Sequence, residues 1–122
     1  MKIQESQENY LEAIYMLSIQ RGDVRSIDIV RHLGFSKPSV SVAMKQLKDN
    51  GYIHMDEKGY ITLLDQGKEI AQRIYERHQT IAQMLISLGV SEDIAFQDAC
   101  KIEHDISEES FSCIKAHFLA HQ

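Results

Sequence analysis

The sequence lacks the features that mark several classes of protein. It contains no run of about 18 or more apolar residues, so we expect no membrane-spanning helix. Residues 1–8 are polar where a secretory signal needs an apolar core, and we therefore expect a cytoplasmic protein. Two cysteines, Cys100 and Cys113, are too few for a disulfide framework, and both should be thiols in a reducing compartment. Repeats and linkers rich in proline, glycine or serine are also missing, so the chain should form an ordinary globular fold.

The charges are distributed unevenly along the chain. The net charge is −5, but residues 1–80 contain equal numbers of basic and acidic residues, so the whole excess lies in residues 81–122. Residues 25–48 contain five basic side chains against one acidic side chain, Asp28. Because charges act within a Debye length of about 10 Å, such a local patch suits phosphate binding even on an acidic protein. The patch alone is equally compatible with an ordinary solvated helix face.

Hydrophobic spacing predicts three helices in the first half of the chain. The first covers residues 6–20, and the second covers residues 26–33 with Ser26 as its N-cap. Gly34 and Phe35 form a turn, and Ser36 caps a third helix that ends at Asn50-Gly51. Pro38 falls in the first turn of that helix, where its missing N–H costs nothing.

The second half begins with a hairpin and continues as helices. Strands are predicted at 52–55 and 60–64, followed by a long helix over 65–88. Ser91 and Ser107 are expected to cap two final helices, which cover residues 92–105 and 108–120.

The order of these elements predicts a mainly α fold with two domains. Residues 1–64 are typical of a winged helix-turn-helix with a two-stranded wing, a DNA-binding arrangement. Residues 65–122 form an α-helical domain, of which 65–88 is a long connecting helix. Many helix-turn-helix pairs bind no DNA, but the following hairpin and the basic patch favour DNA binding here.

The third helix and its surroundings supply the candidate DNA contacts. Serine hydroxyls and backbone N–H groups at its start suit phosphates or base edges, and Pro38 suits a thymine methyl group. The lysines farther along the helix and at the hairpin tip are better placed for phosphates. Ser36 should act as a helix cap whatever else it does. The candidates are Arg25, Ser36, Lys37, Pro38, Ser39, Ser41, Lys45, Lys48 and Lys58.

A second group of residues points to metal binding. Cys100, Glu103 and His104 fall within about 100° of one face of the predicted helix 92–105. Thiolate, carboxylate and imidazole are all ligands for divalent transition metals. His78 lies within the apolar face of the long helix, which also contains Ile74 and Ile81. A lone histidine there is more often a core residue, but beside a second cluster of ligand types it favours a metal site.

The cysteines are compatible with two other roles. Cys100 with a nearby histidine could form a nucleophilic pair, but it lies late in its helix and no glycine-rich turn is available to stabilise an oxyanion. We therefore do not expect an enzyme. A redox switch through Cys100 and Cys113 stays open, although Cys113 is expected to be a small buried hydrophobe.

Four segments resemble a known family, the diphtheria-toxin-repressor and manganese-transport-regulator family of metal-dependent transcriptional repressors. The resemblance covers nearly the whole chain. The segments are Glu8-Asn9-Tyr10-Leu11-Glu12-Ala13-Ile14-Tyr15, Gly34-Phe35-Ser36-Lys37-Pro38-Ser39-Val40-Ser41, Tyr75-Glu76-Arg77-His78 and Asp98-Ala99-Cys100-Lys101-Ile102-Glu103-His104.

The resemblance implies a homodimeric repressor that binds a palindromic operator in double-stranded DNA when loaded with Mn(II) or Fe(II), and so controls metal-ion homeostasis. It implies that residues 65–122 form the metal-binding and dimerisation domain. No organic cofactor and no membrane partner are expected. It further implies the short form of the family, without the C-terminal SH3-like domain of the iron branch.

The resemblance also implies a hybrid ligand set. The family ligands correspond directly to Glu12, His78, Glu103 and His104. Asn9 stands where manganese members have Asp and iron members Met, and Cys100 stands where manganese members have Glu, as in the iron members. Glu12 matches the manganese pattern. A second iron-type site beside His78 is expected to be incomplete, because Ala82 and Phe96 occupy its ligand positions.

Two rival functions remain at this point. One is a winged-helix repressor that senses a small molecule or redox state without metal. The other is a winged helix that binds proteins, which predicts no salt-dependent DNA binding.

Overall fold

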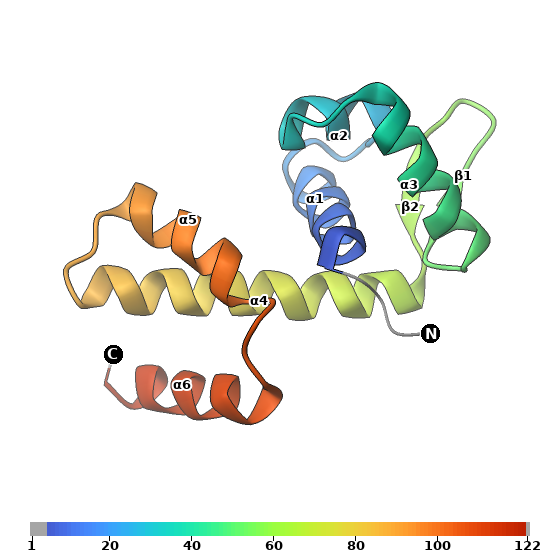
Figure 1. Cartoon of the computed structure of the whole chain (residues 1–122). Helices are drawn as coiled ribbons and strands as arrows, with labels where there is room; N and C mark the ends of the chain where they lie inside the picture. The colour runs from blue at the N-terminus through green and yellow to red at the C-terminus, as the bar shows by residue number, and fades with distance from the viewer. Residues whose placement is uncertain (1–4, 122) are drawn as a thin grey trace. The chain divides into compact units, whose positions relative to one another are not determined.

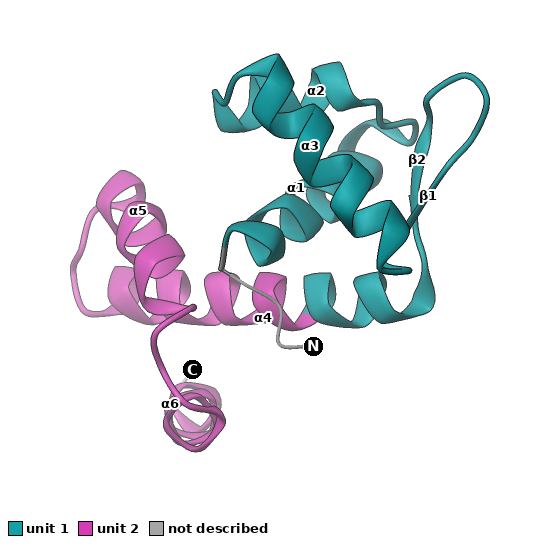
Figure 2. Ribbon diagram, turned by 45° about the vertical axis from the view of Figure 1, so that its right-hand side comes forward, with its two compact units in different colours: residues 1–72 teal, residues 73–122 magenta. Residues whose placement is uncertain are grey.

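The computed structural model describes residues 5–121 (Figure 1). Its elements are α1 (Glu5–Arg21), α2 (Ser26–Leu33), α3 (Lys37–Asp49), β1 (Ile53–Met55), β2 (Ile61–Leu63), α4 (Asp65–Ser87), α5 (Glu92–Ile102) and α6 (Glu108–Ala120). The chain forms two compact units, residues 1–72 and 73–122, which divide within α4 (Figure 2). The expected domain boundary after residue 64 stays a prediction. Among the described helices, none is long and apolar enough to cross a membrane.

The first unit is a winged helix-turn-helix, as predicted. Helices α1, α2 and α3 pack on one core, and the antiparallel pair β1–β2 forms the wing with Ile53 opposite Leu63 and Met55 opposite Ile61. Gly34 ends α2 in a left-handed conformation, with φ of 73°, and its N–H donates to the carbonyl of Val30 at 2.9 Å. The core residues are Tyr10, Leu11, Ile14, Leu17, Val24, Ile29, Val40, Ala43, Met44, Leu47, Tyr52, Ile53, Ile61 and Ala71.

Serine side chains cap two of the helices. The N–H of Ser39 donates to Ser36 Oγ at 3.3 Å, and the N–H of Ser110 donates to Ser107 Oγ at 3.1 Å, so the caps predicted at Ser36 and Ser107 are confirmed. Ser91 is the N-cap of α5, as predicted, but its side chain makes no capping hydrogen bond. The prediction for α2 was wrong, because its N-cap is Arg25 and Ser26 is the first helical residue. The carboxylate of Asp28 accepts the Arg25 N–H at 2.9 Å, so the helix start is held by an acid one turn into the helix.

The second unit contains the rest of α4 with α5 and α6. Its core consists of Ile81, Ala82, Ala99 and Phe111. Two sequence expectations were wrong here. Leu88 lies beyond the end of α4 and is exposed, so the apolar face ends before it. Cys113 is also exposed and is not a buried hydrophobe, because Phe111 is the residue of α6 that faces the core.

Candidate metal centre and DNA-binding surface

Three potential ligands gather between α4 and α5. The ligand atoms of His78, Cys100 and Glu103 all lie within 4.8 Å of one another. His78 comes from the middle of α4, Cys100 from the last turn of α5, and Glu103 from the C-cap position that follows. His78, which the sequence indicated apart from the Cys100 and Glu103 cluster, thus lies beside these two residues.

The Glu103 carboxylate is the innermost group of this cluster. Its side chain is 0% exposed, and its oxygens lie 3.2 Å from His78 Nδ1 and 3.3 Å from His104 Nε2. Burying a carboxylate charge costs on the order of several kcal/mol of free energy unless cations or hydrogen-bond donors surround the carboxylate. A metal ion bound between the carboxylate and the two imidazoles would supply such a cation.

The predicted helix that carries Cys100, Glu103 and His104 ends earlier than expected. The sequence placed Cys100, Glu103 and His104 on one face of a helix that ran to residue 105, whereas α5 ends at Ile102. Glu103 is therefore the C-cap, and His104 lies in the following turn with its side chain 2% exposed beside Glu103. His104 lies outside the group of three, and its role as a ligand stays a prediction.

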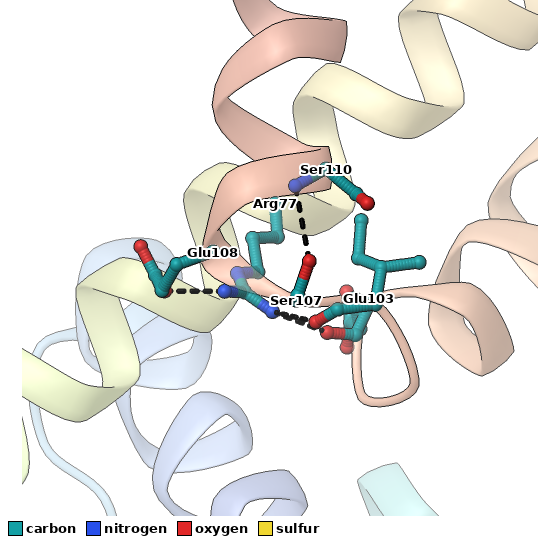
Figure 3. Close-up of polar contacts among 6 residues, drawn as sticks. Arg77, Glu103, Ser107, Glu108 and Ser110 are labelled. Atoms are coloured by element: carbon teal, nitrogen blue, oxygen red, sulfur yellow. Dashed lines mark hydrogen bonds and ion pairs between the residues drawn. The ribbon is translucent and has the colours of Figure 1, made fainter.

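Arg77 explains why the chain turns at this point. Its guanidinium donates to the carbonyls of Glu103 at 3.0 Å and Ile106 at 3.1 Å, and also to the carboxylate of Glu108 (Figure 3). The same group lies over the ring of Phe111, 5.3 Å from its centroid. One buried side chain of α4 therefore holds the segment that presents Glu103. The sequence reasoning missed Arg77, although its spacing of three and four residues from Ile74 and Ile81 places it on the inward face.

An aromatic ring lies beside His78. The ring centroid of Phe96 is 5.5 Å from that of His78, and Ala82, one turn farther along α4, is fully buried. These are the two positions where the sequence predicted that a second, iron-type site would be incomplete. Neither side chain offers a ligand atom, and the Phe96 ring lies beside the imidazole.

The donor set fits a divalent transition metal. Two ligands of one such ion lie at most about 4.6 Å apart, because metal bonds to nitrogen, oxygen and sulfur are about 2.0–2.3 Å long. The three ligand atoms lie within 4.8 Å of one another, so only a small side-chain adjustment separates them from that limit. Cys100 is exposed, whereas Glu103 is fully buried.

The other two predicted ligands lie on α1, in the first unit. Glu12 is buried, and Asn9 precedes it by three residues on the same helical face. Their assignment as ligands stays a prediction. Near them, burial raises the pKa of Tyr10 above its ordinary value, because the phenolate is poorly solvated there.

All predicted DNA contacts on α3 and the preceding turn are exposed, whereas Val40, Ala43, Met44 and Leu47 form its buried face. The exposed residues are Ser36, Lys37, Pro38, Ser39, Ser41, Lys45 and Lys48. One apolar residue, Val42, is 58% exposed on the same surface. The sequence reasoning missed Val42, although it lies between the buried positions of the helical pattern.

The wing is tied to the start of α2. Lys58 is exposed at its tip, and the guanidinium of Arg25 donates to the Lys58 carbonyl. Arg25 also lies over the ring of Tyr60, 5.0 Å from its centroid. Arg25 therefore positions the wing, and its role in contacting DNA stays a prediction, like that of Lys58.

Comparison with known proteins identifies relatives of both halves. Residues 2–61 match the model of the iron dependent repressor N-terminal DNA binding domain, and residues 64–121 match that of the iron dependent repressor metal binding and dimerisation domain. The transcriptional regulator MntR of Salmonella typhimurium is 37% identical over 109 residues, which cover 89% of this chain and 69% of that protein.

Solved structures agree on the fold. The IdeR structure from T. acidophilum is 28% identical with a TM-score of 0.80, and covers 97% of this chain and 55% of its own. The manganese regulator SloR is 25% identical with a TM-score of 0.81, and covers 100% of this chain and 56% of its own. The present chain thus spans little more than half the length of these two solved proteins.

Proposed function

The chain belongs to the iron dependent repressor family of metal-dependent transcriptional regulators, and from that premise we propose that it is a cytoplasmic, homodimeric repressor that binds operator DNA when loaded with Mn(II) or Fe(II). The observation that supports this most directly is the group of His78, Cys100 and Glu103, which offers metal ligands in the same chain as a winged helix-turn-helix. We infer that the protein acts by binding alone, without a catalytic step.

We propose that the ligands are the three clustered residues together with His104 and, from α1, Asn9 and Glu12. When bound, the metal supplies positive charge beside a buried carboxylate and a thiolate, two groups that would otherwise repel each other. The imidazoles of His78 and His104 lie within 3.3 Å of the Glu103 carboxylate oxygens, and Arg77 donates to the Glu103 carbonyl. Phe96 keeps water away from one side of the His78 ring.

The proposed ligands come from both proposed domains, 1–64 and 65–122. Metal binding and DNA binding are then coupled, and the coupling is reciprocal, with a typical magnitude of about 1–3 kcal/mol. In a homodimer, two copies of α3 that read successive major grooves of a palindrome must lie about 34 Å apart. Lys37, Lys45 and Lys48 would neutralise phosphates, while the serines and Pro38 at the helix start would contact base edges.

The donor set narrows the choice of metal only in part. The Cys100 thiolate favours Fe(II) over Mn(II), whereas the oxygen ligands of Asn9, Glu12 and Glu103 suit Mn(II). Both metals therefore stay within the proposal.

The test is operator affinity as a function of metal. The operator is first selected from random duplexes with the wild-type chain and Mn(II), and binding is then measured by fluorescence anisotropy under anaerobic, reducing conditions. We expect Mn(II) or Fe(II) to tighten operator binding about 5- to 150-fold and a chelator to reverse the effect. Equal affinity with and without metal would contradict the proposal and favour a small-molecule or redox sensor.

A further inference from the structure

Helix α6 ends in a pair of histidines that the metal centre above does not use. His117 lies in the last turn and His121 is the C-cap, four residues later. Both residues are exposed, and their ring centroids are 4.1 Å apart with an angle of 30° between the planes. Side chains four residues apart are neighbours on a helix surface, so one ion can bind both rings.

The ring of His121 is oriented by the backbone. Its Nδ1 lies 2.8 Å from the carbonyl oxygen of His117. A carbonyl oxygen only accepts hydrogen bonds, so Nδ1 carries the proton and donates it, which leaves the lone pair on Nε2. Histidines that bind metals are commonly held in this way, with one ring nitrogen donating to a carbonyl and the other facing the ion.

The end of α6 is also electrostatically suited to a cation. The C-terminus of a helix carries roughly half a negative charge, because its last carbonyls have no partners within the helix. Residues 81–122 carry the excess negative charge of the whole chain. A divalent ion bound by two neutral imidazoles is stabilised by both effects.

The dimensions agree with shared coordination. In a tetrahedral zinc site the Zn–N bonds are about 2.0–2.1 Å, so two ligand nitrogens lie about 3.3 Å apart. Two rings with centroids 4.1 Å apart reach that separation by small side-chain rotations. The pair borders a groove of about 520 Å³ whose other walls include Met84, Leu88 and Phe118, so one side of the site is apolar.

A third potential ligand on α6 is too far away to join them. Cys113 is exposed one turn before His117, but it precedes His121 by eight residues, which is about 12 Å along a helix. Cys113 and His121 therefore cannot share one ion on a straight helix. Cys113 instead provides a control for thiol binding.

We propose that His117 and His121 form an ancillary site for a late divalent transition metal, with Zn(II) as the representative ion. Imidazole nitrogens suit Zn(II), Cu(II) and Ni(II), whereas Mn(II) prefers oxygen ligands. The site goes beyond the proposed function, because it shares no residue with the centre at His78 and selects a different class of metal. Two protein ligands leave the remaining coordination positions to water.

The test is a zinc titration of the full chain, with the thiols reduced and a chromophoric chelator as competitor. The principal centre is first disabled by the double substitution His78→Ala and Cys100→Ala. We expect this variant to retain one Zn(II) per chain and to bind no Mn(II). His117→Gln or His121→Gln should each weaken the retained zinc binding about 10- to 100-fold, the range typical of a damaged metal site.

Two matched controls separate this site from incidental binding. Cys113→Ser and His54→Gln, a substitution of an exposed histidine in β1, should leave the retained zinc binding unchanged. The proposal is wrong if the double variant binds no zinc, if neither histidine substitution weakens the retained binding, or if Cys113→Ser abolishes it. None of these outcomes bears on the proposed function, whose test measures operator binding by the wild-type chain.

Discussion

The guanidinium of Arg77 donates to three acceptors, two in the segment between α5 and α6 and one on the first residue of α6, and its side chain is only 8% exposed. Two of these acceptors are backbone carbonyls, and one of them belongs to Glu103. A planar guanidinium can reach several acceptors at once, whereas a lysine ammonium on a flexible stem cannot reproduce that fork. Arg77 is thus a positioning residue for the proposed metal centre, because it acts through the backbone that presents the carboxylate.

We predict that Arg77→Lys lowers the free energy of unfolding by about 1–3 kcal/mol, because buried acceptors lose their donors. Metal affinity should fall as well, since the segment around Glu103 is no longer held. Urea denaturation and a metal titration measure the two effects. Arg31→Lys, at an exposed position of α2, is the control and should change stability by less than about 0.5 kcal/mol. Unchanged metal affinity in a destabilised Arg77→Lys protein would show that Arg77 is structural only.

Lys45 and Val42 on α3 should affect DNA binding in different ways. Lys45→Ala should weaken specific and non-specific binding alike, and should lower the slope of log affinity against log salt by about 0.9 for each lost phosphate contact.

Val42→Ala should leave the salt slope unchanged. It should lower the binding free energy on the operator by about 0.8 kcal/mol per lost methylene, because the exposed methyl groups of Val42 are expected to pack on a thymine. Anisotropy titrations at several salt concentrations, on operator and scrambled duplexes, measure both. A change in the salt slope for Val42→Ala would contradict this assignment.

Among the elements, α4 depends on a glycine at its first turn. A Cβ on Gly67 would lie 2.2 Å from the carbonyl oxygen of Tyr52, a backbone atom that cannot move aside. The helix therefore packs directly against the chain that enters the wing, and only glycine permits that approach. Glycine lowers intrinsic helix stability by about 1 kcal/mol relative to alanine, so its presence here reflects packing rather than helix propensity.

We accordingly predict that Gly67→Ala destabilises the protein by about 1–3 kcal/mol, the usual cost of overpacking, despite the better helix propensity of alanine. Gln66→Ala, in the same turn but at an exposed position, should change stability by less than about 0.5 kcal/mol. Both are measured by urea denaturation. A Gly67→Ala protein as stable as the wild type would show that α4 does not need this close approach.

The same elements show what sequence patterns can and cannot predict. The bounds of α2 and α6 agree with the predicted ranges, because Gly34 and Ser107 act on their own helix ends. The end of α5 was missed by three residues, because its determinant is Arg77, which is distant in sequence. The metal-binding residue types were predicted from local spacing and from the family resemblance. The grouping of His78 with Cys100 and Glu103 depends on how α4 and α5 pack, which periodicity does not encode.

At the scale of the whole molecule, the proposed function requires that metal binding changes the affinity for DNA. The isolated chain exposes large apolar residues in the second unit, namely Leu88, Ile94 and Leu119. Surfaces of this kind are commonly buried in homodimers, and the matched domain is a metal binding and dimerisation domain. Substitutions at the metal centre should therefore change metal-dependent operator affinity while leaving the dimer intact.

The final prediction uses that separation to test the hybrid ligand set. His78→Ala should abolish metal-stimulated operator binding, with the dimer and the helical circular dichroism unchanged.

Cys100→Glu exchanges a soft ligand for a hard one, so it should raise the preference for Mn(II) over Fe(II) and Zn(II) by about 10- to 100-fold. Asn9→Asp should act in the same direction by adding a negative charge near Glu12, and Cys113→Ser should leave the ranking of metals unchanged. Operator affinity titrated with each metal gives the ranking, and sedimentation velocity gives the oligomeric state. An unaltered ranking in Cys100→Glu would remove Cys100 from the ligand set, and a silent His78→Ala would contradict metal control altogether.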